Sequence, residues 1–134
     1  SDDVMIALGL AYVPGDSTGT VAVTLNTGCS DCDVALWSVT GITSYHVYDS
    51  DTDVSGALSL TLDTRADGYL IAAVAAENSL NASTTWTNAS ESVDESTDGM
   101  EISGAIVATS GAAVTVSASF SGTSGTEVMA VMTL

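Results

Sequence analysis

The middle of the chain contains an unbroken run of apolar residues, from Tyr69 to Ala76. Asp67 and Gly68 form a turn-like pair before the run, and the polar stretch 77–79 closes it. Periodicity alone does not separate a buried strand from a buried helix of this length, but the neighbouring segments are rich in Ser, Thr and β-branched residues. The run therefore predicts a central strand that is covered on both faces.

Several other segments alternate apolar and polar residues with a period of two, as a strand with one buried face does. The alternation predicts half-buried strands at residues 20–25 and 57–62, and a hairpin of residues 34–39 and 42–48. A short element at 84–87 and small-residue strands at 100–108, 113–120 and 127–134 follow. No segment is a convincing helix. The pattern predicts an all-β fold, a single β-sandwich or jelly-roll-like domain of about eight to nine strands.

The first 13 residues are predicted to be a strand or an arm, and residues 14–134 the sandwich domain. The apolar positions of this first segment do not alternate cleanly, and Pro14 ends it. An arm that packs on a partner or under the sandwich is therefore as good an interpretation as an ordinary strand. The candidate partner-binding residues are Val4, Met5, Ile6, Leu8 and Leu10.

Acidic residues dominate the charged positions: 17 Asp and Glu stand against one Lys or Arg, which is Arg65, and the formal net charge is −16. Nucleic acid is excluded as a partner because phosphate binding needs clustered cations, and an anionic membrane is excluded on the same ground. Salt screens the repulsion within such a surface, so the charge indicates a saline setting. It also opposes self-association despite an apolar fraction of 46%.

Cys29 and Cys32 form a Cys-x-x-Cys pair in an Asp-flanked loop. A redox dithiol would need a helix N-terminus to lower the thiol pKa, and neighbouring negative charge raises it instead. A structural zinc site needs four ligands, whereas the chain offers the two cysteines, His46 and nearby carboxylates. A local disulfide or two free thiols is the simpler interpretation, and the sequence leaves both open.

Asp49, Asp51 and Asp53 place three carboxylates on alternate residues of a predicted acidic turn, the spacing by which a calcium loop gathers oxygens around one ion. The segment is not an EF-hand, because Val54 stands at the glycine position and Leu60 at the bidentate-acid position. A solvated acidic loop is the favoured interpretation, and a calcium site at Asp49, Asp51 and Asp53 is its alternative.

A second acidic stretch lies in a predicted polar loop, residues 88–99. Glu91, Asp94, Glu95 and Asp98 would stack on one face of a helix, where like charges repel. An exposed loop is therefore the favoured structure for this stretch.

Catalytic arrangements find little support in the sequence. His46 is the only histidine, there is no Gly-x-Ser-x-Gly elbow, and no two glycines lie two apart as the dinucleotide fingerprint requires. No catalytic residue and no cofactor is predicted, and calcium at the acidic turn is the alternative left open. Trp37 and Trp86 are interpreted as core or sheet-face anchors, with a sugar-binding platform as the alternative.

Residues 68–91 combine a glycine-led apolar strand, a Ser/Asn connection, the Thr-x-Trp-Thr element at 84–87 and an acid at Glu91. Together with the small-residue strand 113–122, this stretch resembles small virion proteins of tailed bacteriophages, especially capsid decoration (cement) proteins of marine or alphaproteobacterial phages. The likeness covers about half the chain.

The resemblance implies a non-enzymatic β-sandwich on the outer capsid surface of a virion. Its expected partner is the major capsid protein, on which copies of the chain would form a homo-oligomer and stiffen the shell. Two alternatives stay open from the residues alone. One is a calcium-dependent carbohydrate-binding or adhesion module that uses the Asp49–Asp53 cluster, and the other is an acidic surface-layer or appendage subunit of a halophile.

Overall fold

A computed structural model of the chain describes residues 4–11, 14–15, 19–24, 32, 34–42, 48–53, 57–96 and 99–134. Six strands lie in this part and every pairing between them is antiparallel. They are β1 (Tyr48–Asp53), β2 (Ala57–Leu62), β3 (Ala66–Thr87), β4 (Ser90–Ser96), β5 (Met100–Ser110) and β6 (Val114–Thr133). The described residues contain no helix, so none that could span a membrane.

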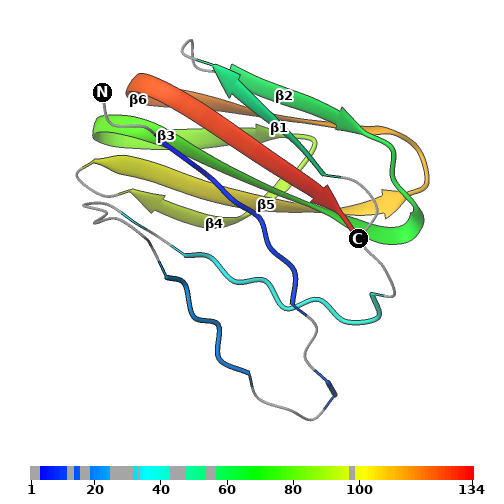
Figure 1. Ribbon diagram of the computed structural model, residues 1–134. Helices are drawn as coiled ribbons and strands as arrows, with labels where there is room; N and C mark the ends of the chain where they lie inside the picture. The colour runs from blue at the N-terminus through cyan, green and yellow to red at the C-terminus, as the bar shows by residue number, and fades with distance from the viewer. Residues whose placement is uncertain are drawn as a thin grey trace.

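The two long strands, β3 and β6, each contribute to both layers of a sandwich. In the first sheet the order is β1-β6-β3-β5-β4, built on residues 70–76 of β3 and 127–133 of β6. In the second sheet β2 pairs with the beginning of β6, which pairs with residues 83–87 of β3. Figure 1 shows both long strands folding back at the same end of the molecule. The six strands thus supply eight strand segments in two sheets, and the prediction of a single all-β sandwich is confirmed.

The hydrophobic core lies between the two sheets. Leu70, Ala72 and Val74 of β3 point into it and are fully buried, while Ile71 and Ala73 of the same strand are buried against the opposite face. The predicted central strand covered on both faces is therefore confirmed. The cluster of buried residues facing these from both sheets comprises Leu58, Leu62, Val116, Ala118, Met129 and Val131.

The N-terminal part of the chain departs from the prediction. Residues 19–24 and 34–42 belong to no hydrogen-bonded strand, so the strands expected at 20–25 and 34–39 are wrong over the described positions. Residues 43–47 of the expected hairpin lie outside the described residues. Alternation favours an extended backbone, but a strand also needs a partner, and the pattern does not say whether a partner exists.

Both acidic stretches are strands rather than a turn and a loop. Tyr48–Asp53 forms β1 and Ser90–Ser96 forms β4. They occupy the two opposite edges of the first sheet. Charged side chains on an edge strand oppose pairing with another molecule, which is the physical role that the sequence reading missed.

The end of the chain also differs from the expected pair of strands. The Gly-rich stretch after Phe120 was predicted to separate two strands, but β6 runs continuously from Val114 to Thr133. Gly122 adopts a φ of 81° within it, a conformation that glycine takes without steric cost. The stretch bends the strand from one sheet to the other instead of ending it.

Candidate functional site

The outer face of the first sheet is apolar across its three middle strands. Ile71, Ala73 and Ala75 of β3 share this face with the residues directly opposite them, because paired residues of an antiparallel ladder point to the same side. Their partners on β6 are Met132, Ala130 and Val128, and their partners on β5 are Ile106, Gly104 and Ile102. The small residues at its centre, Ala73, Ala130 and Gly104, let another segment approach closely there.

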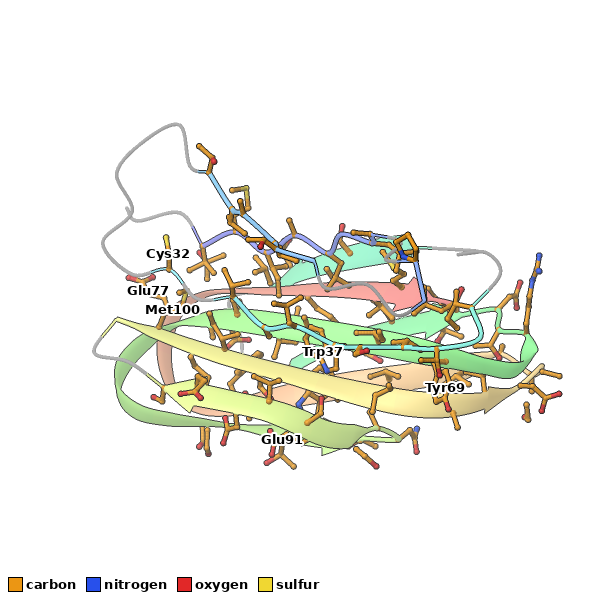
Figure 2. All side chains as sticks on the ribbon, turned by 90° about the horizontal axis from the view of Figure 1, so that it is seen from below. Cys32, Trp37, Tyr69, Glu77, Glu91 and Met100 are labelled. Atoms are coloured by element: carbon orange, nitrogen blue, oxygen red, sulfur yellow. The ribbon has the colours of Figure 1, made fainter. Side chains whose placement is uncertain are left out.

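The segment 34–42 covers part of this face, and Trp37 is its anchor. A Cβ atom added to Gly104 would lie 2.7 Å from Cη2 of Trp37, so the indole ring rests against a strand position that only glycine leaves open. The Trp37 Nε1–H donates to Ser92 Oγ at 2.9 Å, and Ser92 Oγ donates to the Gly104 carbonyl at 3.1 Å. Figure 2 shows Trp37 between its own segment and the sheet. The interpretation of Trp37 as a sheet-face anchor is confirmed.

The arm at residues 4–11 packs beside the edge of the same sheet. Val4, Ile6 and Leu8 are half-buried, while Met5 is 81% exposed. A cavity of about 470 Å³ lies between the arm and the strands β1 and β6. Its lining is Ile6, Ala7, Leu8, Leu10, Asp49, Ser50, Ala130, Val131 and Met132. The arm thus contacts its own sheet with alternate residues and leaves the others to the outside.

We call the described segments 4–11, 19–24 and 34–42 the N-terminal layer; in Figure 1 they are drawn in blue and cyan, outside the two sheets. Of the seven large hydrophobic side chains that are exposed in the described residues, six belong to this layer. They are Met5, Leu10, Val21, Val23, Val34 and Leu36. The three described segments themselves contain no charged residue, but the sequence before and between them carries Asp2, Asp3, Asp16, Asp31 and Asp33, which lie outside the described residues. Exposed apolar side chains gathered on one layer are a candidate docking surface.

The outer face of the second sheet has a different chemistry, and we call it the hydroxyl face. Hydroxyl groups pair across its strands: Ser59 with Ser117 at 2.9 Å and Thr61 with Thr115 at 2.7 Å. Ser83 pairs with Ser121 at 2.8 Å. Each hydroxyl therefore has a protein partner and remains accessible to water.

A buried acid lies between the sheets near the end where β3 bends. Glu101 of β5 and Glu127 of β6 are paired with Ala76 from its two sides, and they are 0% and 1% exposed. Thr84 Oγ1 donates to Glu101 Oε1 at 3.1 Å. Burial, followed by the neighbouring Asp94 carboxyl, raises the pKa of Glu101 to about 7. Glu101 Oε2 is buried and has no hydrogen-bond partner.

Trp86 belongs to a second polar contact between the sheets. Its Nε1–H donates to Ser103 Oγ at 2.8 Å, and Ser103 Oγ lies 2.8 Å from Glu91 Oε1 and 3.0 Å from the Val93 carbonyl oxygen. The Trp86 side chain packs against the core cluster. This confirms the interpretation of Trp86 as an anchor.

The predicted calcium residues lie on β1. Asp49 is exposed, and its Oδ1 accepts a hydrogen bond from the Ser50 N–H at 2.8 Å. The turn on which the prediction was based is absent, because alternate residues of a strand lie about 6.6 Å apart instead of curling around one point. The side chains of Asp51 and Asp53 lie outside the described ones, so calcium binding there stays a prediction. Among the described residues no three His, Cys, Asp or Glu side chains are grouped to hold a metal ion.

The cysteine motif is clearer. Cys32 is disulfide-bonded, and Cys29, the only other cysteine of the chain, lies outside the described residues, as does His46. The free-thiol and zinc interpretations are therefore wrong for Cys32, since a half-cystine sulfur is not a thiolate ligand.

Gly104 and Glu101 are not among the site residues that the sequence predicted. A glycine inside a strand pattern is a signal for close approach of another segment, and Gly104 carries it. Glu101 gives no such signal, because an acid near a strand end is ordinarily solvated. Comparison of the chain with protein-family models, with curated proteins and with solved structures found no match.

Proposed function

We propose that the chain is a structural decoration protein that binds the outer surface of a virus capsid through its N-terminal layer. The observation that carries the proposal is the set of exposed apolar side chains on this layer. Monomeric proteins keep such surfaces small unless a partner covers them, so the layer has the chemistry of a docking surface. The resemblance of residues 68–91 and 113–122 to phage decoration proteins gives the partner its identity, the major capsid protein.

The charge distribution supports the same function. The edge strands β1 and β4 border the N-terminal layer, and their acidic residues repel other copies of the protein in solution. A protein displayed in many copies must dock on the shell without aggregating beforehand. A partner whose apolar surface is rimmed by basic residues would satisfy both the layer and the acidic surroundings.

The gain for the capsid follows from linkage. A protein that binds the assembled shell, and has no affinity for its dissociated subunits, stabilises the shell in proportion to affinity and copy number. Homo-oligomers formed on the shell would add avidity, because each bound copy raises the effective concentration of the next contact.

Co-sedimentation with undecorated capsids tests the proposal. We expect the purified protein to sediment with capsids and to raise the temperature at which they disrupt. The variant Met5→Ser/Leu36→Ser, which alters two exposed side chains of the layer, should bind at least tenfold more weakly. The matched control is Thr61→Val/Ser59→Ala on the hydroxyl face, which should bind as the wild type does. No sedimentation of the wild type, or equal loss in both variants, would reject docking through the N-terminal layer.

A further inference from the structure

Glu101 lies between the sheets beside the carboxyl of Asp94, and its negative charge needs compensation. Glu101 is fully buried, and Thr84 donates a hydrogen bond to its Oε1. Its other oxygen, Oε2, is buried without a partner. The carboxyl of Asp94 lies beside it and adds a second negative charge. An ionised carboxylate in such a place is unfavourable unless a positive charge meets it.

The chain has little positive charge to offer. Its single Lys or Arg is Arg65. The backbone carbonyl of Arg65 accepts a hydrogen bond from Thr109, which lies near the opposite end of β5 from Glu101. Eight residues of strand separate Thr109 from Glu101, a distance of about 26 Å. Charge compensation at Glu101 therefore comes either from a proton or from a cation taken up from the solvent.

We propose that Glu101 and Asp94 bind one divalent cation of the calcium type at the β4–β5 edge of the sandwich. Calcium takes six to eight oxygen ligands and accepts carboxylates, hydroxyls, backbone carbonyls and water together. The hydroxyls of Thr84 and Ser96 hydrogen-bond to the Glu101 carboxyl, so neutral oxygen ligands lie next to it. Asp94 is exposed, which opens the pair to solvent on the β4 side.

The two carboxylates would supply the charged ligands, and hydroxyls and water would complete the coordination. The site is distinct from the cluster on β1, because β1 and β4 are opposite edges of the first sheet. Glu127, on the far side of Ala76, has interactions of its own and is not counted as a ligand. The site is independent of capsid docking, since no residue of the N-terminal layer takes part in it.

Calcium chloride titration of the full chain at pH 8 tests the site by calorimetry and by thermal melting. We expect one calcium ion to bind per chain and the melting temperature to rise relative to the protein in EDTA. Glu101→Gln should abolish both the heat and the rise, and Asp94→Asn should weaken binding at least tenfold. Glu95→Gln, which neutralises the exposed neighbour on β4, is the matched control and should bind as the wild type does.

Three results would overturn the site. The first is the absence of heat and of a melting shift in the wild type at millimolar calcium, which would leave a shared proton as the compensation. The second is a calcium response that survives in Glu101→Gln. The third is a response that disappears in Asp49→Asn/Asp51→Asn/Asp53→Asn and not in Asp94→Asn, which would place the ion on β1. Because free protein is used, failure here leaves the capsid proposal untouched, and failure of capsid binding leaves the site untouched.

Discussion

The two outer faces of the sandwich both include residues of the long strands β3 and β6, but they present opposite surfaces. On the first sheet the residues around Ala73 are apolar, and Gly104 leaves room for the Trp37 ring of the layer above. On the second sheet Ser and Thr hydroxyls bond to one another across the strands. Neither of these sets of residues includes a charged side chain.

The difference shows which face needs a cover. The polar groups of the hydroxyl face are satisfied by each other and by water, so that face is stable as it stands. The apolar face gains free energy only by being removed from water. The N-terminal layer removes part of it, but turns its own apolar side chains outward. The outward apolar side chains of the N-terminal layer would gain free energy if a partner buried them. We therefore place the docking surface on this layer.

The largest expected effect on stability comes from a side chain placed at Gly104, where the Trp37 ring packs on the sheet. In Gly104→Leu the new side chain occupies the space of the indole ring, so the ring and its hydrogen bond to Ser92 are lost. We expect a loss of about 3 kcal/mol in the free energy of unfolding, measured by urea denaturation. The sandwich itself should persist, as β-type circular dichroism would show.

The matched change on the other face is Ser119→Leu, at an exposed position of β6. It should cost under about 1 kcal/mol, because surface substitutions away from special contacts have small effects. In a Trp37→Ala background the cost of Gly104→Leu should fall by more than half, since the clashing ring is absent. Equal losses for Gly104→Leu and Ser119→Leu would mean that the two faces do not differ in the way described.

A pH titration should show that the interior, and neither outer face, dominates the pH dependence of stability. Burial and Asp94 raise the pKa of Glu101 from 4.5 to about 7, so between these values the folded protein binds more protons than the unfolded chain. The free energy of unfolding therefore falls by up to about 3 kcal/mol as the pH rises from about 4.5 to about 7. Above that pH it levels off.

The measurement is urea denaturation in EDTA at pH 4.5, 6 and 8. The charged group that raises the pKa of Glu101 is Asp94 from β4, and Glu127 of β6 lies on the other side of Ala76. Glu101→Gln has the same shape for the contact with Thr84 but does not ionise. We therefore expect its free energy of unfolding not to fall with pH and to exceed that of the wild type at pH 8. A fall of the same size in Glu101→Gln would assign the pH dependence to other carboxylates.

The sequence predicts the sandwich better than it predicts the site. The run from Tyr69 to Ala76 and the alternation of Ala57–Leu62 report burial directly, and both appear as strands with the expected faces. Long-range pairing is not encoded in such local patterns. Residues 34–39 have the same alternation as a paired strand, yet they lie over a sheet face instead of joining its edge.

Charge patterns misled for a related reason. An acidic segment such as Ser90–Ser96 is typical of a loop when its neighbours are unknown, but an edge strand tolerates the same charges because one side of it meets water. Glu101 is the opposite case, an acid that a local pattern would leave solvated and that the second sheet buries. The position of Thr84 above it depends on the bend in β3, which only the folded topology reveals.

The smallest effects on stability should come from exposed side chains on the two sides of the sandwich. Variants there differ little in stability but should differ in affinity for capsids. Thr61→Val removes one exposed hydroxyl pair with Thr115, a loss of about 0.5–1 kcal/mol that the β-branched replacement partly offsets. Leu36→Ser, at a side chain that is 69% exposed, should change the free energy of unfolding by less than about 0.5 kcal/mol.

The two variants should diverge on capsids. Leu36→Ser removes part of the apolar surface that a partner would bury, so its affinity should fall although its fold is intact. Thr61→Val adds a methyl group to the hydroxyl face and should bind as the wild type does. Sedimentation of both variants against a dilution series of capsids measures the difference. A weaker affinity for Thr61→Val than for Leu36→Ser would move the docking surface to the second sheet, where cross-strand hydroxyls and not exposed apolar side chains would have to recognise the partner.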